Sequence, residues 1–334
     1  MESARVTPAA LRAAIVYNPT KLDLFDLRSA VAEAERTARW ASSLWLSTTE
    51  DDPGSETTRD ALRQNVAMVV AAGGDGTVRA VAETLMNTGV PLAIVPAGTG
   101  NLLARNLSLA PVRLAKSVAA AFNSHARAID VGVAKLTYET GETSERVFVV
   151  MAGIGLDAHM IANTKPSLKN RVGWLAYLDS GMKSIWSHTP ITVCFSLDGA
   201  PEQTARVSTI LIGNCGTMPG NIKVLPDSAI DDGVLDIAVV QPDGVVGWIQ
   251  VGHRVAWKNG FLRRRAMRYD SIKRSKPATL RALNYMRGTR LRVEVDPPEQ
   301  IQLDGDDYGR VRSVSIEVNP RSLLVKVPAG PRQK

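Results

Sequence analysis

Two short glycine-rich segments carry residue types suited to phosphate binding. Residues 73–77 read Gly-Gly-Asp-Gly-Thr and directly follow the apolar run 69–72. Glycines let a backbone adopt conformations closed to other residues and approach a phosphate closely, and the N-terminus of a following helix adds positive potential. We expect Thr77 to cap that helix and Asp75 to orient a metal-bound water or a ribose. Taken alone, however, such a segment is more often a glycine turn without a ligand.

The second segment changes this balance. Residues 96–101 read Pro-Ala-Gly-Thr-Gly-Asn, follow the apolar run 92–95 and precede a helix predicted at 102–106. Two such loops on neighbouring strands would form one crevice. Two further predicted strands end in the polar segments 17–20 and 47–50, which supply small hydroxyl and amide side chains. Together, the four strand ends predict a nucleotide site.

The elements that must position these loops alternate between strand and helix. The predicted strands are 13–17, 45–48, 67–71 and 92–95, and the predicted helices are 26–40, 56–64, 77–86 and 102–106. This alternation indicates a doubly wound parallel sheet with helices on both faces, which binds ligands beyond the carboxyl ends of its strands.

The texture changes after about residue 130. Short β-rich runs predict an antiparallel β-sandwich, with turns at 198–199, 232–233 and 296–298. Helical inserts are predicted at 167–187 and 245–267. The domains expected are 1–129 (nucleotide-binding) and 130–320 (β-sandwich), with 321–334 returning to the first. The runs that predict strands in the second domain are 146–151, 192–197, 207–212, 235–240 and 291–295.

Five motifs in this order resemble the diacylglycerol kinase catalytic-domain superfamily, which includes bacterial lipid kinases and sphingosine kinases. The resemblance covers nearly the whole chain, and the order of the motifs makes it specific. The motifs are residues 73–77, 96–101, 153–158 (Gly-Ile-Gly-Leu-Asp-Ala), 231–236 (Asp-Asp-Gly-Val-Leu-Asp) with Asn214, Gly216 and Pro226, and 302–306 (Gln-Leu-Asp-Gly-Asp).

The resemblance implies a two-domain kinase with an ATP site between an α/β domain and a β-sandwich. It makes Asp306 the general base, supported by Asp304 and Asp75. It also makes Asp232 the side-chain ligand of a structural Mg²⁺, together with nearby carbonyl groups, those of Ala229 and Val234. The residues it places at the nucleotide are Asn18, Thr48, Gly74, Asp75, Gly76, Thr77, Gly98, Thr99 and Asn101.

Two departures from the family pattern leave alternatives open. Asp306 stands where bacterial diacylglycerol kinases usually have Glu, and Leu102 stands where they usually have Asp. The leading hypothesis is a kinase for diacylglycerol or a related lipid. The alternatives are a kinase for a soluble acceptor, since NAD kinases share a related loop, and a catalytically impaired nucleotide- or lipid-binding regulatory protein.

Composition bears on location and partners. The net charge of +7 favours an anionic partner, and the predicted inserts combine tryptophan with basic residues, as suits an anionic membrane surface or packing on the second domain. We therefore expect a cytoplasmic protein, peripherally bound to the inner face of the membrane and spanning nothing. Cys194 and Cys215 are expected to be buried free thiols. No nucleic-acid-binding module is visible, and a homodimer is compatible with the sequence.

Overall fold

The computed structural model of this 334-residue chain describes residues 10–109, 113–155, 190–218, 222–241, 247 and 282–328. The chain divides into two compact units, Met1–Ile129 with Arg321–Lys334 and Asp130–Pro320. Each unit has its own hydrophobic core. Apart from residue 247, the predicted inserts at 167–187 and 245–267 lie outside the described residues.

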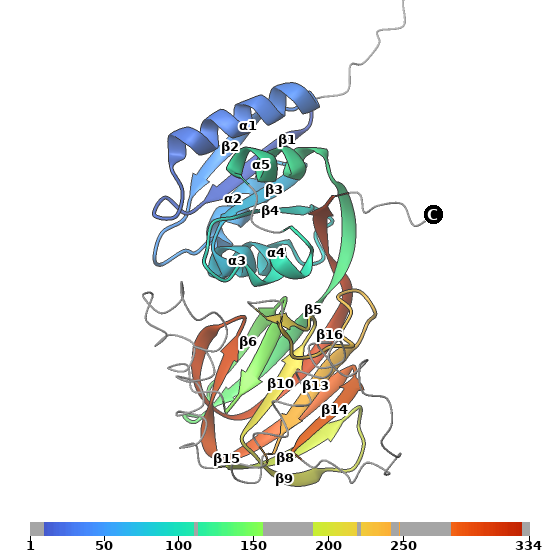
Figure 1. The fold of residues 1–334 in the computed structure, drawn as a ribbon. Helices are drawn as coiled ribbons and strands as arrows, with labels where there is room; N and C mark the ends of the chain where they lie inside the picture. The colour runs from blue at the N-terminus through green and yellow to red at the C-terminus, as the bar shows by residue number, and fades with distance from the viewer. Residues whose placement is uncertain are drawn as a thin grey trace, which may run out of the picture. The chain divides into compact units, whose positions relative to one another are not determined.

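The first unit is built on a parallel sheet in the order β2-β1-β3-β4-β16 (Figure 1). Its strands are β1 (Arg12–Tyr17), β2 (Ala41–Ser47), β3 (Met68–Gly73), β4 (Leu92–Pro96) and the last part of β16 (Asp306–Val327). Its helices are α1 (Leu24–Ala38), α2 (Ser55–Arg63), α3 (Asp75–Leu85), α4 (Leu102–Asn106) and α5 (Leu114–Asn123).

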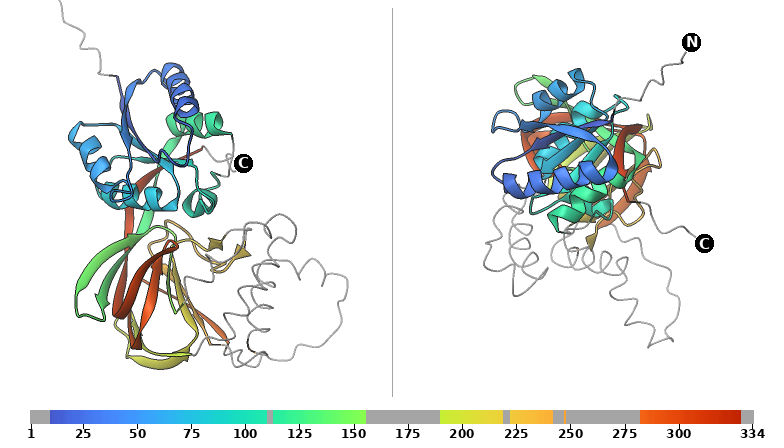
Figure 2. Two further views of the ribbon diagram at one scale, coloured as in Figure 1. Left: turned by 90° about the vertical axis from the view of Figure 1, so that its left-hand side faces the viewer. Right: turned by 90° about the horizontal axis from the view of Figure 1, so that it is seen from above.

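The sheet is covered by helices on both faces, as Figure 2 shows. Ile15 and Val70 point to one face and pack with residues of α1 and α5 in one core cluster. Val16 and Ala71 are also fully buried, on the face that α2 and α3 contact. Burial on both faces explains why these strands read as continuous apolar runs. The predicted doubly wound sheet is confirmed; α5 is an element that the sequence patterns did not predict.

The second unit is a β-sandwich. One path of paired strands runs β14-β13-β10-β7-β15-β16; β8 joins β15 to β9, and β5 joins β16 to β6. The bounds are β5 (His125–Tyr138), β6 (Thr143–Phe148), β7 (Met151–Ile154), β8 (Ile191–Leu197), β9 (Gln203–Val207), β10 (Thr209–Gly213), β13 (Leu235–Val240), β14 (Leu283–Gly288) and β15 (Arg290–Leu303). A separate small ladder pairs β11 (Thr217–Met218) with β12 (Ile222–Lys223).

Strand β15 serves both sheets of the sandwich. Its first half pairs with β8 and its second half with β7, and its register to β16 shifts between Glu294 and Glu299. Strands that change sheets commonly do so at such an irregularity. The turn predicted at 296–298 is therefore wrong, because the chain continues in β15 through a bulge. The strand predicted at 146–151 is also not continuous: Val149 and Val150 separate β6 from β7.

Two smaller expectations have clear outcomes. Both cysteines are free, but only Cys215 is buried, while Cys194 on β8 is half-buried. Within the ranges that the structure describes, no helix has the length and apolar character needed to cross a membrane.

Candidate functional site

The polar strand ends of the first unit meet at one edge of its sheet. Gly73 at the end of β3 lies in register with Pro96 at the end of β4, and the Ala97 amide donates to the Gly73 carbonyl at 2.9 Å. On the other side of β3, the Asn18 amide donates to the Ala72 carbonyl at 2.9 Å. Thr48, which follows β2, is bound in the same way to the end of β1. All four predicted loops thus emerge at the carboxyl edge, where α/β sheets bind ligands.

Asp75 joins the two glycine-rich loops. Its carboxylate accepts the amide N–H groups of Asn101 at 2.8 Å and Leu102 at 2.6 Å. These are the first amides of α4, which has no cap from its own N-cap side chain. A carboxylate that accepts such amides stabilises the helix start through hydrogen bonds and through the helix dipole. Asp75 of α3 is therefore the cap of α4, and its predicted role towards a ribose or a metal-bound water stays a prediction.

The glycines of the two loops make room for this contact. A Cβ atom on Gly98 would lie 2.9 Å from the Cα atom of Gly74, and one on Gly100 would lie 2.5 Å from an Asp75 carboxylate oxygen. Neither loop contains a glycine with positive φ; the left-handed residue is Asn101, with φ of 49°. The expectation that these glycines adopt conformations closed to other residues is therefore wrong. They are needed because the two backbones and the carboxylate approach closely.

The start of α3 differs from the prediction. The helix begins at Asp75, two residues earlier than expected, and its N-cap is Gly74, which offers no side-chain hydrogen bond. Thr77 lies in the first turn and is buried, so it is not the cap. A helix start that lacks a side-chain cap presents its first amides, including that of Gly76, to an anion.

The remaining loop residues divide by orientation. Thr99 is exposed at the tip of the second loop. The Asn101 side chain turns back on its own loop, where its oxygen accepts the Gly98 amide at 2.9 Å and its NH₂ group donates to the Gly98 carbonyl at 2.8 Å. Asn101 thus fixes the loop shape, and its predicted contact with a nucleotide remains a prediction.

In the second unit, Asp304 is a buried anchor. Only 6% of the residue is exposed, and its carboxylate accepts the amides of Val149, Val150 and Met151 at 2.8–2.9 Å. These three residues form the junction between β6 and β7. Asp304 itself has a φ of 52° in the tight turn that it forms with Gly305 between β15 and β16. The carboxylate therefore fixes the acidic turn to the sandwich.

Asp306 lies two residues later in very different surroundings. It is the first residue of β16, pairs with Leu303 across the turn, and is exposed. The structure therefore separates the two predicted catalytic carboxylates of this turn into a buried one that holds backbone amides and an exposed one.

Asp232 lies opposite a guanidinium group. One of its oxygens forms an ion pair with Arg287 of β14, and the other accepts the Val234 amide at 3.3 Å. The same guanidinium lies 3.2 Å from Asp236 on β13. Asp236 is only 6% exposed, and among the described residues its second oxygen, Oδ2, has no hydrogen-bond partner. Burial raises the pKa of Asp236; Arg287 opposes this, and the Asp232 and Asp227 carboxylates raise the pKa further.

The donor set around Asp232 fits a hard cation. Carboxylate and carbonyl oxygens are the ligands that Mg²⁺ accepts, usually one or two carboxylates with retained waters. Within the described ranges, no three His, Cys, Asp or Glu side chains are grouped so that they could hold a metal by themselves. A site at Asp232 therefore needs backbone carbonyls, and those of Ala229 and Val234 lie in the same loop.

Asp130 is a residue of this region that the sequence reasoning missed. It is fully buried, its carboxylate accepts the Gly233 amide at 2.6 Å, and its own amide donates to the Ile230 carbonyl at 2.8 Å. Its carbonyl also accepts the Asn214 side-chain amide at 2.7 Å. The sequence does contain a signal for it, because Asp130 is a lone carboxylate in the apolar run 129–134. A carboxylate buried in such a run needs hydrogen-bond partners.

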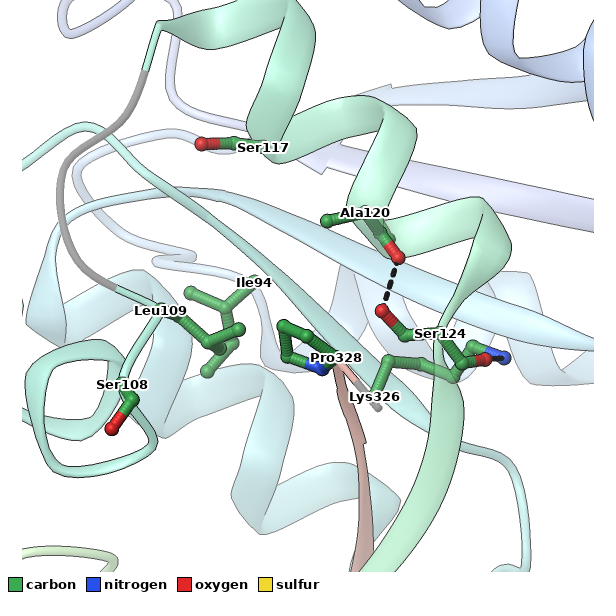
Figure 3. A pocket seen from close by; sticks show the side chains of 9 residues that line it. Ile94, Ser108, Leu109, Ser117, Ala120, Ser124, Lys326 and Pro328 are labelled. Carbon is green, nitrogen blue, oxygen red and sulfur yellow. Dashed lines mark hydrogen bonds between the residues drawn. The ribbon is translucent and has the colours of Figure 1, made fainter. Parts of the chain in front are cut away.

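A small cavity of about 170 Å³ lies elsewhere in the first unit (Figure 3). It shares no residue with the candidate site. Its walls are largely apolar, and the amino group of Lys326 is engaged by the Ser124 carbonyl. The lining residues are Ile94, Ser108, Leu109, Ser117, Ala120, Ala121, Ser124, Lys326 and Pro328.

Comparison with known families covers most of the chain. Residues 12–134 match the diacylglycerol kinase catalytic domain, and residues 149–327 match the YegS C-terminal NAD kinase beta sandwich-like domain. The chain is 28% identical over 302 residues to a diacylglycerol kinase of Bacillus subtilis, covering 89% of this chain and 90% of that protein. It is 30% identical over 312 residues to a probable YegS-like lipid kinase of Pseudomonas aeruginosa PAO1, covering 91% and 90%.

The fold has a solved counterpart. The crystal structure of a diacylglycerol kinase from Bacillus anthracis strain Sterne superposes with a TM-score of 0.63 and covers 96% of this chain and 98% of that one. The sequences are 19% identical. At this identity the likeness concerns the fold.

Proposed function

The chain belongs to the family of diacylglycerol kinase catalytic domains, and we propose that it is an ATP- and Mg²⁺-dependent kinase for a hydroxyl group of diacylglycerol or a related lipid. The observation that carries this proposal is the Asp75 carboxylate, which fixes two glycine-rich loops together at the carboxyl edge of a parallel sheet. Two glycine loops joined in this way present backbone amides and little side-chain bulk, as a polyphosphate requires.

On the nucleotide side, the chain's task is to position phosphates. The amides that begin α3 would bind the phosphate oxygens, and the exposed Thr99 hydroxyl would add a donor from the second loop. Asn18 and Thr48, at the ends of β1 and β2, would contact the rest of the nucleotide. Phosphoryl transfer depends mainly on such positioning and on charge neutralisation, so loops already fixed by hydrogen bonds lower the cost of binding.

On the acceptor side, Asp306 would act as general base. It would accept the proton of the lipid hydroxyl as that oxygen attacks the γ-phosphorus and ADP leaves. Asp304 would hold the acidic turn in place through its three backbone hydrogen bonds, which makes it a positioning residue. Asp232, with the carbonyls of Ala229 and Val234, would hold a structural Mg²⁺, while a Mg²⁺ bound with ATP would neutralise charge on the phosphates.

The test is transfer of labelled phosphate. Purified protein, Mg²⁺ and labelled ATP are offered mixed micelles of diacylglycerol, monoacylglycerol, ceramide, sphingoid base or polyprenol. We expect an organic-phase product, and Asp306→Asn should lower kcat by about 10²–10⁴-fold. The matched control is Glu142→Gln, which neutralises an exposed carboxylate in the β5–β6 turn of the same unit and should leave the rate unchanged.

Two other outcomes would replace the lipid-kinase proposal. Transfer to NAD or another water-soluble acceptor, with none to any lipid, would make the protein a kinase of soluble substrates. Tight ATP binding without transfer to any acceptor would favour a regulatory protein. Leu102 lacks the carboxylate that bacterial diacylglycerol kinases usually have at this position, which keeps the second outcome open. Its backbone amide still donates to Asp75, so the link between the two loops does not depend on the Leu102 side chain.

We place this activity at the cytoplasmic face of the membrane, where the acceptor lipid resides. The net charge of +7 supports attraction to anionic lipid. The basic and tryptophan-bearing inserts that suggested membrane contact lie outside the described residues. Sedimentation with phosphatidylglycerol vesicles but not with phosphatidylcholine vesicles is expected at low salt; equal recovery with both would contradict an electrostatic attachment.

A further inference from the structure

The guanidinium of Arg287 is shared between two carboxylates, Asp232 and Asp236, which differ in how many of their oxygens have a hydrogen-bond partner. Towards Asp232 it forms the ion pair already described, and the other Asp232 oxygen is occupied by the Val234 amide. Towards Asp236 it reaches one oxygen at 3.2 Å, while the other, Oδ2, is buried and has no hydrogen-bond partner in the part of the chain that the structure describes. A buried carboxylate oxygen without a hydrogen bond is costly, so the arrangement leaves one strong acceptor unfilled.

The surrounding strands place these groups on one side of the sheet. Asp236 and Arg287 are directly paired residues of β13 and β14, so their side chains share a face. The loop that contains Asp232 lies over this face, and it is attached at its two ends by other contacts. The Tyr285 hydroxyl donates to the Val224 carbonyl at 3.0 Å, and Asp130 holds Gly233. Between these two anchors, the Arg287–Asp232 pair also links the loop to β14.

We infer that Arg287 is a built-in competitor of the divalent cation for Asp232, and that it moves wholly onto Asp236 when the cation binds. A guanidinium presents a fork of donors that matches a carboxylate in two parallel hydrogen bonds. With Asp232 given up to the cation, the released donors of Arg287 can fill the vacant Oδ2 of Asp236. The loop that contains Asp232 is then held by the Arg287 guanidinium when the cation is absent. When the cation is bound, the cation holds it instead. This inference rests on the proposed Mg²⁺ at Asp232.

The experiment measures Mg²⁺ binding directly, by calorimetry on the full chain without nucleotide. Both partners of the ion pair are partly exposed, so Arg287→Met should bind Mg²⁺ roughly threefold to tenfold more tightly than the wild type. The Asp236→Asn variant should bind Mg²⁺ more weakly. Of the two carboxylates only Asp232 then remains to pair with Arg287, so the guanidinium competes more strongly with the cation. In the Arg287→Met background, Asp236→Asn should have little further effect, since Asp236 acts through Arg287. A merely structural arginine would not raise the affinity when removed.

Controls separate the failure of this inference from the failure of its premise. Arg290→Met removes a nearby guanidinium that pairs with Glu317 and should leave Mg²⁺ affinity unchanged. Arg287→Lys, which keeps the charge but loses the fork, covers the case in which Arg287→Met does not fold, and it should bind more tightly than the wild type. Equal or weaker binding by the folded Arg287 variants would overturn the inference. Mg²⁺ binding that survives Asp232→Asn, or the absence of Mg²⁺ binding in every variant, would overturn both the metal assignment and the inference. The proposed kinase activity is tested separately, by the lipid phosphorylation assay.

Discussion

Asp75 and Asp304, one in each unit, perform the same structural task to different extents. Both belong to Asp-Gly pairs in motifs that suggest catalysis, and both use their carboxylates to hold backbone amides of a distant segment. Asp75 is half-buried and accepts two amides; Asp304 is almost fully buried and accepts three. The comparison teaches that an acidic residue in such a motif can fix the backbone, while its neighbour in the same turn, here Asp306, is exposed.

The largest stability loss is expected at Asp304. Replacing it by Ala leaves three buried amides without acceptors, so the free energy of unfolding should fall by about 3–5 kcal/mol. The Asp304→Asn variant should lose nearly as much unfolding free energy, because the asparagine NH₂ group would face backbone amide donors. Urea unfolding of the full chain measures both changes. Glu142→Ala, which truncates an exposed carboxylate of the same unit, is the control. A loss below about 1 kcal/mol would mean that the anchor is dispensable.

A smaller loss, together with a loss of ligand binding, is expected at Asp75. Asp75→Ala removes the cap of α4, which should cost about 1–3 kcal/mol of unfolding free energy. The two glycine loops would lose the link that Asp75 makes between them, so affinity for a non-hydrolysable ATP analogue should fall by about tenfold or more, as a loss of 1.4 kcal/mol would produce. Calorimetry measures the affinity, with Asp60→Ala on the exposed face of α2 as control. Unchanged affinity in a destabilised protein would separate the cap from the nucleotide site.

These two anchors also mark what sequence patterns can and cannot predict. The α/β alternation was readable because strands buried on both faces become apolar runs such as 69–72, and the family resemblance, the fold class and the lipid-kinase class are confirmed. The long strands β5 and β16 were not anticipated. Their partly exposed residues break the apolar pattern, and their pairing partners lie far away in the sequence.

The roles within the site were less readable than the motifs. The partners of Asp75 are 26 and 27 residues away, and those of Asp304 are more than 150 residues away. No local spacing encodes such contacts. Arg287 was missed for the same reason, because only the pairing of β13 with β14 brings it to Asp236. The motifs therefore locate the chemistry, and the tertiary contacts decide which carboxylate is an anchor.

The smallest effects are expected at two more exposed aspartates that also accept amides, one in each unit. Burial tends to raise the pKa of Asp52, but hydrogen bonds from Thr57, Gly54 and Glu56 together hold it below its ordinary value. The Arg290 amide lowers the pKa of Asp198, against the effect of burial, and Thr289 lowers it further.

A depressed carboxyl pKa stabilises the fold above the pKa of the unfolded chain, and this stability is lost as the pH falls through the lower folded value. Asp52→Asn and Asp198→Asn should therefore each flatten the decline of the urea midpoint between about pH 4 and pH 2, where an aspartate with a depressed pKa titrates. Hydrogen exchange resolved by peptide should assign the first change to α2 and the second to the hairpin of β8 and β9. If the urea midpoints of the variants decline with acid as steeply as that of the wild type, the hydrogen bonds of Asp52 and Asp198 persist in the unfolded chain. The comparison between the two units then rests on the buried anchors alone.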